Sequence, residues 1–155
     1  MSSVYFIDTN ALSKRYVLER GTAWIQGILH PNLSNTIYIA RITGVELVSA
    51  ITRRERGGTI APNDAQSARS VLRAHLITEY KTIEITPLIL ERAMTFAENF
   101  GLRGYDAVQL ASTYEVNVLY TSQGLPAVTL VSSDTELNTA ALALGLAVNN
   151  PNDYP

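Results

Sequence analysis

A short apolar run that ends in a carboxylate, Val4-Tyr5-Phe6-Ile7-Asp8, constrains most strongly what this chain can fold into. Four consecutive apolar or aromatic residues are too few for a helix, and their types favour a strand buried on both faces, as in a parallel sheet covered by helices. A helical pattern begins shortly afterwards, at Ala11. Asp8 is therefore expected at the carboxyl end of the first strand, which is the edge where open α/β sheets bind ligands.

The rest of the chain alternates between the two kinds of pattern. Strands are predicted at residues 36–40, 82–85, 128–131 and 147–149, and helices at 11–20, 22–29, 42–56, 62–80, 88–100, 105–116 and 135–144. This alternation predicts an α/β fold with a mostly parallel central sheet flanked by helices. Residues 117–127, which include Gly124 and Pro126, are predicted to form a loose loop. The length predicts a single domain over residues 1–155.

Composition excludes several kinds of site. Cysteine is absent, and the two histidines, His30 and His75, are far apart in sequence, which argues against disulfides and an ordinary zinc site. No apolar run approaches the roughly 20 residues of a membrane span. The first strand is expected almost at the N-terminus, with no signal peptide before it. We therefore expect a cytoplasmic protein without a membrane partner.

Four acids stand at predicted strand ends or helix starts, and each has an ordinary structural explanation. Asp8 and Asp134 can cap the helices that follow them. Thr43 and Glu46 have the spacing of a capping box. Asp106 lies in a first helical turn, where a carboxylate interacts favourably with the helix dipole.

Together, the same acids indicate a site. Glu46 lies between Val45 and Leu47, where an unpaired charge is costly. Asp8 and Asp134 both follow apolar strands, so they belong to the same edge of the sheet. If those strands are neighbours, all four carboxylates can converge on one point, where like charges require cations. Hard oxygen ligands without histidine or cysteine suit Mg²⁺ or Mn²⁺.

Four segments of the chain resemble, in order, the motifs of PIN-domain ribonucleases. They are Ile7-Asp8-Thr9-Asn10-Ala11-Leu12, Thr43-Gly44-Val45-Glu46-Leu47, Gly104-Tyr105-Asp106-Ala107-Val108-Gln109-Leu110-Ala111 and Val131-Ser132-Ser133-Asp134-Thr135-Glu136-Leu137. Residues 145–151 are similar to the closing strand of that family. The short form of the chain is most similar to the VapC-type toxins of bacterial toxin–antitoxin modules. The resemblance implies a PIN-like, three-layer α/β/α fold.

The resemblance also implies a function and a set of site residues. It implies a metal-dependent endoribonuclease that is dimeric and is held inactive by a cognate antitoxin. The implied catalytic and metal-binding residues are Asp8, Glu46, Asp106 and Asp134, with one or two Mg²⁺ or Mn²⁺ ions as cofactor. Thr9 and Ser133 match polar positions that orient ligands or water.

Charge patterning adds candidates for RNA binding. The net charge is −2, but seven of the twelve basic residues fall between positions 14 and 56. Setting aside the four site acids leaves 14 − 4 = 10 acids against 12 bases, a surplus of +2. Lys14, Arg15 and Arg41 are the candidates to guide an RNA backbone, although each is better explained as an ordinary surface charge.

Two other functions remain open from the sequence. One is a catalytically idle PIN fold that only binds a partner, against which the four intact acids argue. The other is a phosphoacceptor domain of the receiver kind, which usually has adjacent acids after the first strand and a lysine after a late strand. Here Ile7 precedes Asp8, and the last lysine is Lys81.

Overall fold

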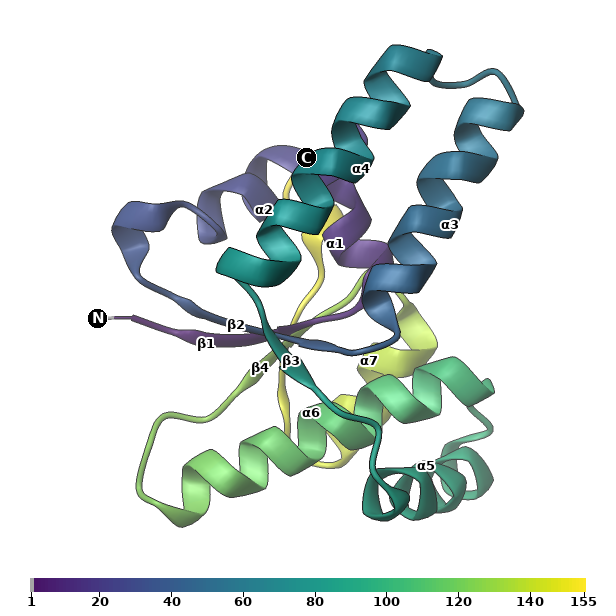
Figure 1. The fold of residues 1–155 in the computed structure, drawn as a ribbon. Coiled ribbons are helices and arrows are strands. Elements are labelled where there is room, and N and C mark those ends of the chain that lie inside the picture. Colours follow the sequence, from purple (N-terminus) through teal and green to yellow (C-terminus); the bar gives the residue numbers. More distant parts are fainter. Residues whose placement is uncertain (1) are drawn as a thin grey trace.

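Five parallel strands form one sheet in the order β3-β2-β1-β4-β5 within residues 2–155, the part of the chain that this computed structural model describes (Figure 1). The strands are β1 (Val4–Ile7), β2 (Thr36–Ala40), β3 (Lys81–Ile83), β4 (Thr129–Val131) and β5 (Ala147–Asn149). Every neighbouring pair is parallel, and Ile7 on β1 lies beside Val131 on β4. The predicted α/β fold with a mostly parallel sheet is confirmed.

Helices cover both faces of this sheet and make three layers (Figure 1). One layer holds α1 (Thr9–Tyr16), α2 (Thr22–Ile28), α3 (Thr43–Arg56) and α4 (Pro62–Thr78). The other holds α5 (Pro87–Phe100), α6 (Gly104–Ser122) and α7 (Thr135–Ala143). Two short 3-10 helices, η1 (Pro31–Leu33) and η2 (Pro151–Asp153), complete the described elements.

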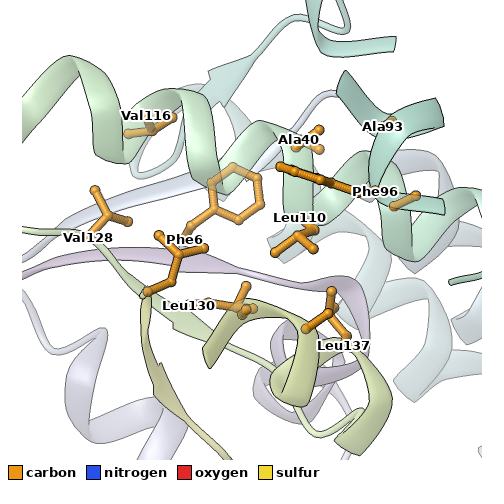
Figure 2. Close-up of a cluster of buried hydrophobic side chains, with 14 of the residues drawn as sticks. Phe6, Ala40, Ala93, Phe96, Leu110, Val116, Val128, Leu130 and Leu137 are labelled. Atoms are coloured by element: carbon orange, nitrogen blue, oxygen red, sulfur yellow. The ribbon is translucent and has the colours of Figure 1, made fainter. Parts of the chain in front are cut away.

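Successive residues of the central strand serve the two layers in turn, because side chains of a strand alternate between its faces. Phe6 faces α5–α7, where it packs in one cluster with Leu110 and Leu137 (Figure 2). Ile7 faces α1–α4 and packs with Leu12 and others in a second cluster. Burial on both faces explains why the strand is a continuous apolar run.

The strand order places a crevice beside the end of β1. From β1 the chain adds β2 and then β3 on one side, and it later adds β4 and β5 on the other. The order of addition therefore reverses between β1 and β4, and such a switch point leaves a crevice at the carboxyl ends of the strands. Asp8 follows β1 and Asp134 follows β4, so both acids lie at that crevice.

Several predicted boundaries were wrong, most clearly in residues 117–127. Helix α6 continues to Ser122, so the first six of those residues are helical. Val116 and Tyr120 pack into the core, and the Tyr120 hydroxyl lies 3.0 Å from that of Tyr38 on β2. These contacts stabilise the helix as far as Ser122, and the chain turns two residues later at Gly124, which adopts a positive φ of 71°. Helix α1 ends at Tyr16 instead of Arg20, and β3 begins at Lys81 instead of Thr82.

None of the helices in residues 2–155 is both long enough and apolar enough to cross a membrane.

Candidate active site

Asp8 is the buried centre of the crevice. It caps α1, accepts hydrogen bonds from the Thr9 backbone N–H at 2.8 Å and the Ser132 hydroxyl at 2.9 Å, and is only 4% exposed. Burial is the main cause that raises the pKa of Asp8 to about 7; the charges of Asp106 and Glu46 add to it, while the two hydrogen bonds oppose it. A nearby cation would favour the charged form of such a carboxyl group.

Glu46 on α3 is joined to the end of β1 through Thr9. The Thr9 hydroxyl donates to Glu46 Oε1 at 2.9 Å and lies 3.3 Å from the Thr43 hydroxyl. The capping box expected from Thr43 and Glu46 is absent at this helix, because its N-cap is Ile42 and no side chain caps it. Val45 is 65% exposed, so Glu46 is also less enclosed by apolar neighbours than its sequence suggested.

Gln109 connects Thr9 and Thr43 to α6. Its side chain is buried, and its Nε2 lies 3.2 Å from Thr43 Oγ1 and 3.4 Å from Thr9 Oγ1. The Gln109 amide donates to the hydroxyl oxygens of both threonines. The hydroxyl proton of Thr9 is therefore free to be donated to the Glu46 carboxylate.

Asp106, in the first turn of α6, lines the same pocket as Asp8 and Glu46. This pocket, the Asp8 hollow, has a volume of about 320 Å³ and is lined by Asp8, Thr9, Asn10, Ser13, Glu46, Ala50 and Asp106. The pKa of Asp106 is raised by burial first and then by Asp134, with further contributions from Glu46 and Glu136, while Arg103 lowers it. These couplings mean that the acids repel one another across the crevice.

Asp134 occupies a neighbouring position rather than the same pocket. It caps α7 by accepting from the Leu137 backbone N–H at 2.9 Å. It lines a second pocket, the Arg103 hollow, with a volume of about 340 Å³ and the lining residues Arg103, Ser133, Asp134, Thr135 and Glu136. Asn10 Oδ1 accepts from both the backbone N–H and the hydroxyl of Ser133 at 3.0 Å, which ties the two hollows together.

A comparison of the sequence with models of protein families identifies the family of this chain. The sequence profile of the PIN domain matches residues 5–142, which is most of the chain. The chain belongs to the PIN domain family. PIN domains are nucleases as a family, and they generally use divalent metal ions. A comparison with curated proteins finds no match.

Three solved structures have a similar fold. VapBC2 from Rickettsia felis, bound to a DNA fragment from its promoter, is 16% identical with a TM-score of 0.59, over 95% of this chain and 98% of that one. PAE2754 from Pyrobaculum aerophilum is 25% identical with a TM-score of 0.59, over 90% and 87%. A toxin–antitoxin complex from Klebsiella pneumoniae is 19% identical with a TM-score of 0.57, over 97% and 98%.

The side chains of this PIN domain fit a hard divalent cation in their chemistry, although they do not form a closed shell. Carboxylate oxygens are the ligands that Mg²⁺ and Mn²⁺ prefer. Asp8 is buried, carries two hydrogen bonds and faces other negative charges. Across residues 2–155, however, no three acidic, histidine or cysteine side chains are grouped closely enough to hold one ion. The convergence of four carboxylates on a single point, expected from the sequence, is therefore replaced by two adjacent hollows.

The three bases singled out from the sequence all have acidic partners. Lys14 is buried and lies 3.2 Å from Glu19, so the prediction that it guides RNA was wrong. The Arg15 guanidinium lies 2.6 Å from Glu79 and also donates to the Tyr80 hydroxyl. Arg41 is exposed and pairs with Glu84 beside β3.

Sequence reasoning missed Gln109, Ser132, Arg103 and Glu136 as members of the site. Gln109 had a detectable signal, because it is a polar residue within the apolar run Ala107-Val108-Gln109-Leu110-Ala111. A long polar side chain on a buried helix face needs partners, and here the partners are the two threonines. Arg103 and Glu136 gave no such signal, since charged residues near helix starts are common.

Proposed function

We propose that this PIN domain is a metal-dependent endoribonuclease that hydrolyses phosphodiester bonds of RNA. The observation that carries the proposal is that Asp8, Glu46 and Asp106 line one hollow at the switch point of a PIN-family sheet. Asp134 lies at the adjacent hollow and is electrostatically coupled to Asp106.

Each residue has a role that follows from its surroundings. Asp8 is the primary ligand for Mg²⁺ or Mn²⁺, because its buried charge gains most from a cation. Glu46 and Asp106 would complete the binding of the ion from α3 and α6, at least one of them through an intervening water, because no three acids are grouped closely enough within residues 2–155 to hold it directly. Asp134 would hold a second ion or a water. Thr9 fixes the Glu46 carboxylate, and Ser133 fixes the junction with Asn10. When bound, the cation acts as a Lewis acid, which lowers the pKa of a water molecule and neutralises the charge that develops on the phosphate.

A cytoplasmic toxin of a toxin–antitoxin module is the cellular role that we propose. Support comes from two structural neighbours, one described as a toxin–antitoxin complex from Klebsiella pneumoniae and the other as VapBC2 from Rickettsia felis. We expect a cognate antitoxin to bind this chain and block cleavage. Induced expression should arrest growth, and sequencing of the 5′ ends of transcripts should then reveal the cleaved RNAs. Growth arrest should disappear when the antitoxin is produced together with the chain.

The decisive experiment uses a circular RNA, which has no ends and is therefore cut only by an endonuclease. With Mn²⁺ or Mg²⁺ the purified protein should linearise it, and EDTA should abolish the reaction. Asp106→Asn, purified in the same way, should be slower by about a hundredfold or more, the scale of losing a key electrostatic contact. Equal cleavage by the variant would assign the activity to a contaminant and refute the proposal.

The alternative hypothesis, a catalytically idle PIN fold that only binds a partner, predicts the opposite result in the same assay. It predicts no linearisation by wild type at any metal concentration, together with retained binding of a protein partner. The receiver-like alternative is excluded by membership of the PIN domain family.

A further inference from the structure

Arg103 is the basic residue that faces the acidic crevice. It precedes α6 as its N-cap residue, is exposed, and lines the Arg103 hollow together with Ser133, Asp134, Thr135 and Glu136. Two hydrogen bonds connect this hollow to the Asp8 hollow, because the backbone N–H and the hydroxyl of Ser133 in the first both donate to Asn10 Oδ1 in the second. The Arg103 guanidinium therefore lies next to the proposed cleavage site, but it does not line the Asp8 hollow, where the ion would bind.

The other bases do not offer an equivalent charge. Six of the twelve are engaged in ion pairs with acids, namely Lys14, Arg15, Arg41, Arg54, Arg69 and Arg92. Arg20 donates to the Asn152 carbonyl, and Lys81 lies over the Tyr38 ring. The remaining three lie on the α3–α4 hairpin, where Arg53 and Arg56 end α3 and Arg73 lines a groove with Val45. Within residues 2–155, Arg103 makes no ion pair with an acid.

RNA approaching this site meets repulsion as well as attraction. The two hollows together carry the acids Asp8, Glu46, Asp106, Asp134 and Glu136. Bound cations offset part of that charge, but a neighbouring phosphate of the strand still needs a donor of its own. A guanidinium suits this task, since its planar fork forms two hydrogen bonds to a phosphate. The hollow also contains the exposed Thr135 hydroxyl, a second donor for a phosphate oxygen.

We propose that Arg103 binds the backbone phosphate next to the scissile phosphodiester and so sets the position of the RNA strand across the two hollows. This inference rests on the proposed ribonuclease function. It assigns to α6 a substrate-binding role in addition to the acid that the same helix carries.

The test compares cleavage kinetics of a single-stranded RNA oligonucleotide by wild type, Arg103→Gln and Arg103→Lys at several salt concentrations in saturating Mn²⁺. Arg73→Gln is the matched control, because Arg73 is also exposed but lies on α4. We expect Arg103→Gln to raise KM about tenfold or more, the effect of one lost charge-assisted hydrogen bond. The slope of log(1/KM) against log[salt] should become shallower by about 0.7, the change for one single-strand phosphate contact.

The lysine variant should recover the salt slope but only part of the affinity, because it keeps the charge and loses the fork. The control should match wild type. If Arg103 only shields the acids, Arg103→Gln will lower the melting temperature in EDTA while KM and the salt slope stay at wild-type values, and the inference is overturned. Wild type that cleaves no RNA overturns the proposed function and this inference together, whereas active wild type with an unchanged variant overturns this inference alone.

Discussion

Burial of Asp8 makes the stability of the protein depend on pH in a defined direction. The folded protein keeps this proton up to about pH 7, whereas an unfolded chain releases it near the ordinary value of 3.8. Because the folded state binds the extra proton, the free energy of unfolding should fall as pH rises between these two values, by roughly a few kcal/mol. Asn accepts the same cap bond as Asp, so Asp8→Asn should retain the fold and lose most of this slope.

Urea unfolding in EDTA at about pH 5 and about pH 8 measures the effect of Asp8. Asp64→Asn is the control, since Asp64 is an exposed acid in the first turn of α4 and should leave the slope unchanged. Adding Mn²⁺ at 100 times its dissociation constant should stabilise wild type by about 2.7 kcal/mol, and Asp8→Asn by much less. A wild type that is as stable at the higher pH as at the lower one, and is indifferent to Mn²⁺, would contradict the buried cation site.

Gln109 should matter more for activity than for stability. Its Oε1 is buried without a hydrogen-bond partner among the described residues, which already costs the folded state free energy. Gln109→Leu should therefore leave stability unchanged or raise it by about 1 kcal/mol. Cleavage should slow by about tenfold or more, because the Thr9 hydroxyl is then free to turn away from Glu46.

Ser112→Ala is the matched control for Gln109. Ser112 lies on the same helix, is fully buried and also lacks a partner for its Oγ among residues 2–155. It should give a similar or smaller change in the urea midpoint and no loss of cleavage rate. If Gln109→Leu cleaves RNA as fast as wild type, the orienting role of the amide is wrong.

Helix α2 depends on a glycine where the chain passes close to its own C-terminal segment. Gly21 precedes α2 with a φ of 86°, and a Cβ there would lie 2.4 Å from the Pro151 carbonyl oxygen in η2. Gly21→Ala combines a left-handed backbone with a backbone clash, so we expect a loss of about 2 kcal/mol or more in the free energy of unfolding.

Gly27, within the same helix, provides the contrast. Its added Cβ would meet nothing within 4 Å, so Gly27→Ala should be neutral or stabilising by up to about 1 kcal/mol. Urea unfolding of both variants tests the pair. Equal effects of the two substitutions would mean that the contact between α2 and η2 does not restrict the backbone.

The assembly of the protein is expected to be a closed two-fold dimer, the commonest symmetric arrangement. Helix α4 offers little continuous apolar surface for the interface, because Leu72 is fully buried in the core and Leu76 is half-buried, whereas Val71 is exposed. Helix α5 presents a more continuous apolar face, since Leu90 and Met94 are 44% and 54% exposed and lie four residues apart, whereas the exposed Ile77 on α4 is six residues from Val71.

Light scattering at micromolar concentration should give about twice the 17.0 kDa mass of one chain. Met94→Glu should shift the protein to monomer, because it places a charge in a desolvated interface. Val71→Glu, on α4, should remain dimeric if α5 forms the contact. A monomeric wild type would refute the dimer, and dissociation by Val71→Glu alone would place the interface on α4.

The local sequence pattern was sufficient to predict the fold class and to place the four acids at strand ends or helix starts. The apolar run ending at Asp8, the alternation of strands with helices and the order of the motifs each depend on neighbours a few residues away. The strand boundaries at Val4–Ile7, Thr36–Ala40 and Ala147–Asn149 accordingly agree between sequence and structure.

Tertiary contacts decided which polar groups meet. Ser132 reaches Asp8 across 124 residues of sequence, and Gln109 reaches Thr9 across 100. Tertiary contacts also place Lys14 in a buried ion pair with Glu19 and allow α6 to continue to Ser122. Periodicity predicts which face of an element is apolar, but hydrogen bonds act only at about 3 Å and charge couplings over about 10 Å. Their partners therefore depend on how the helices dock on the sheet, which only the packed core fixes.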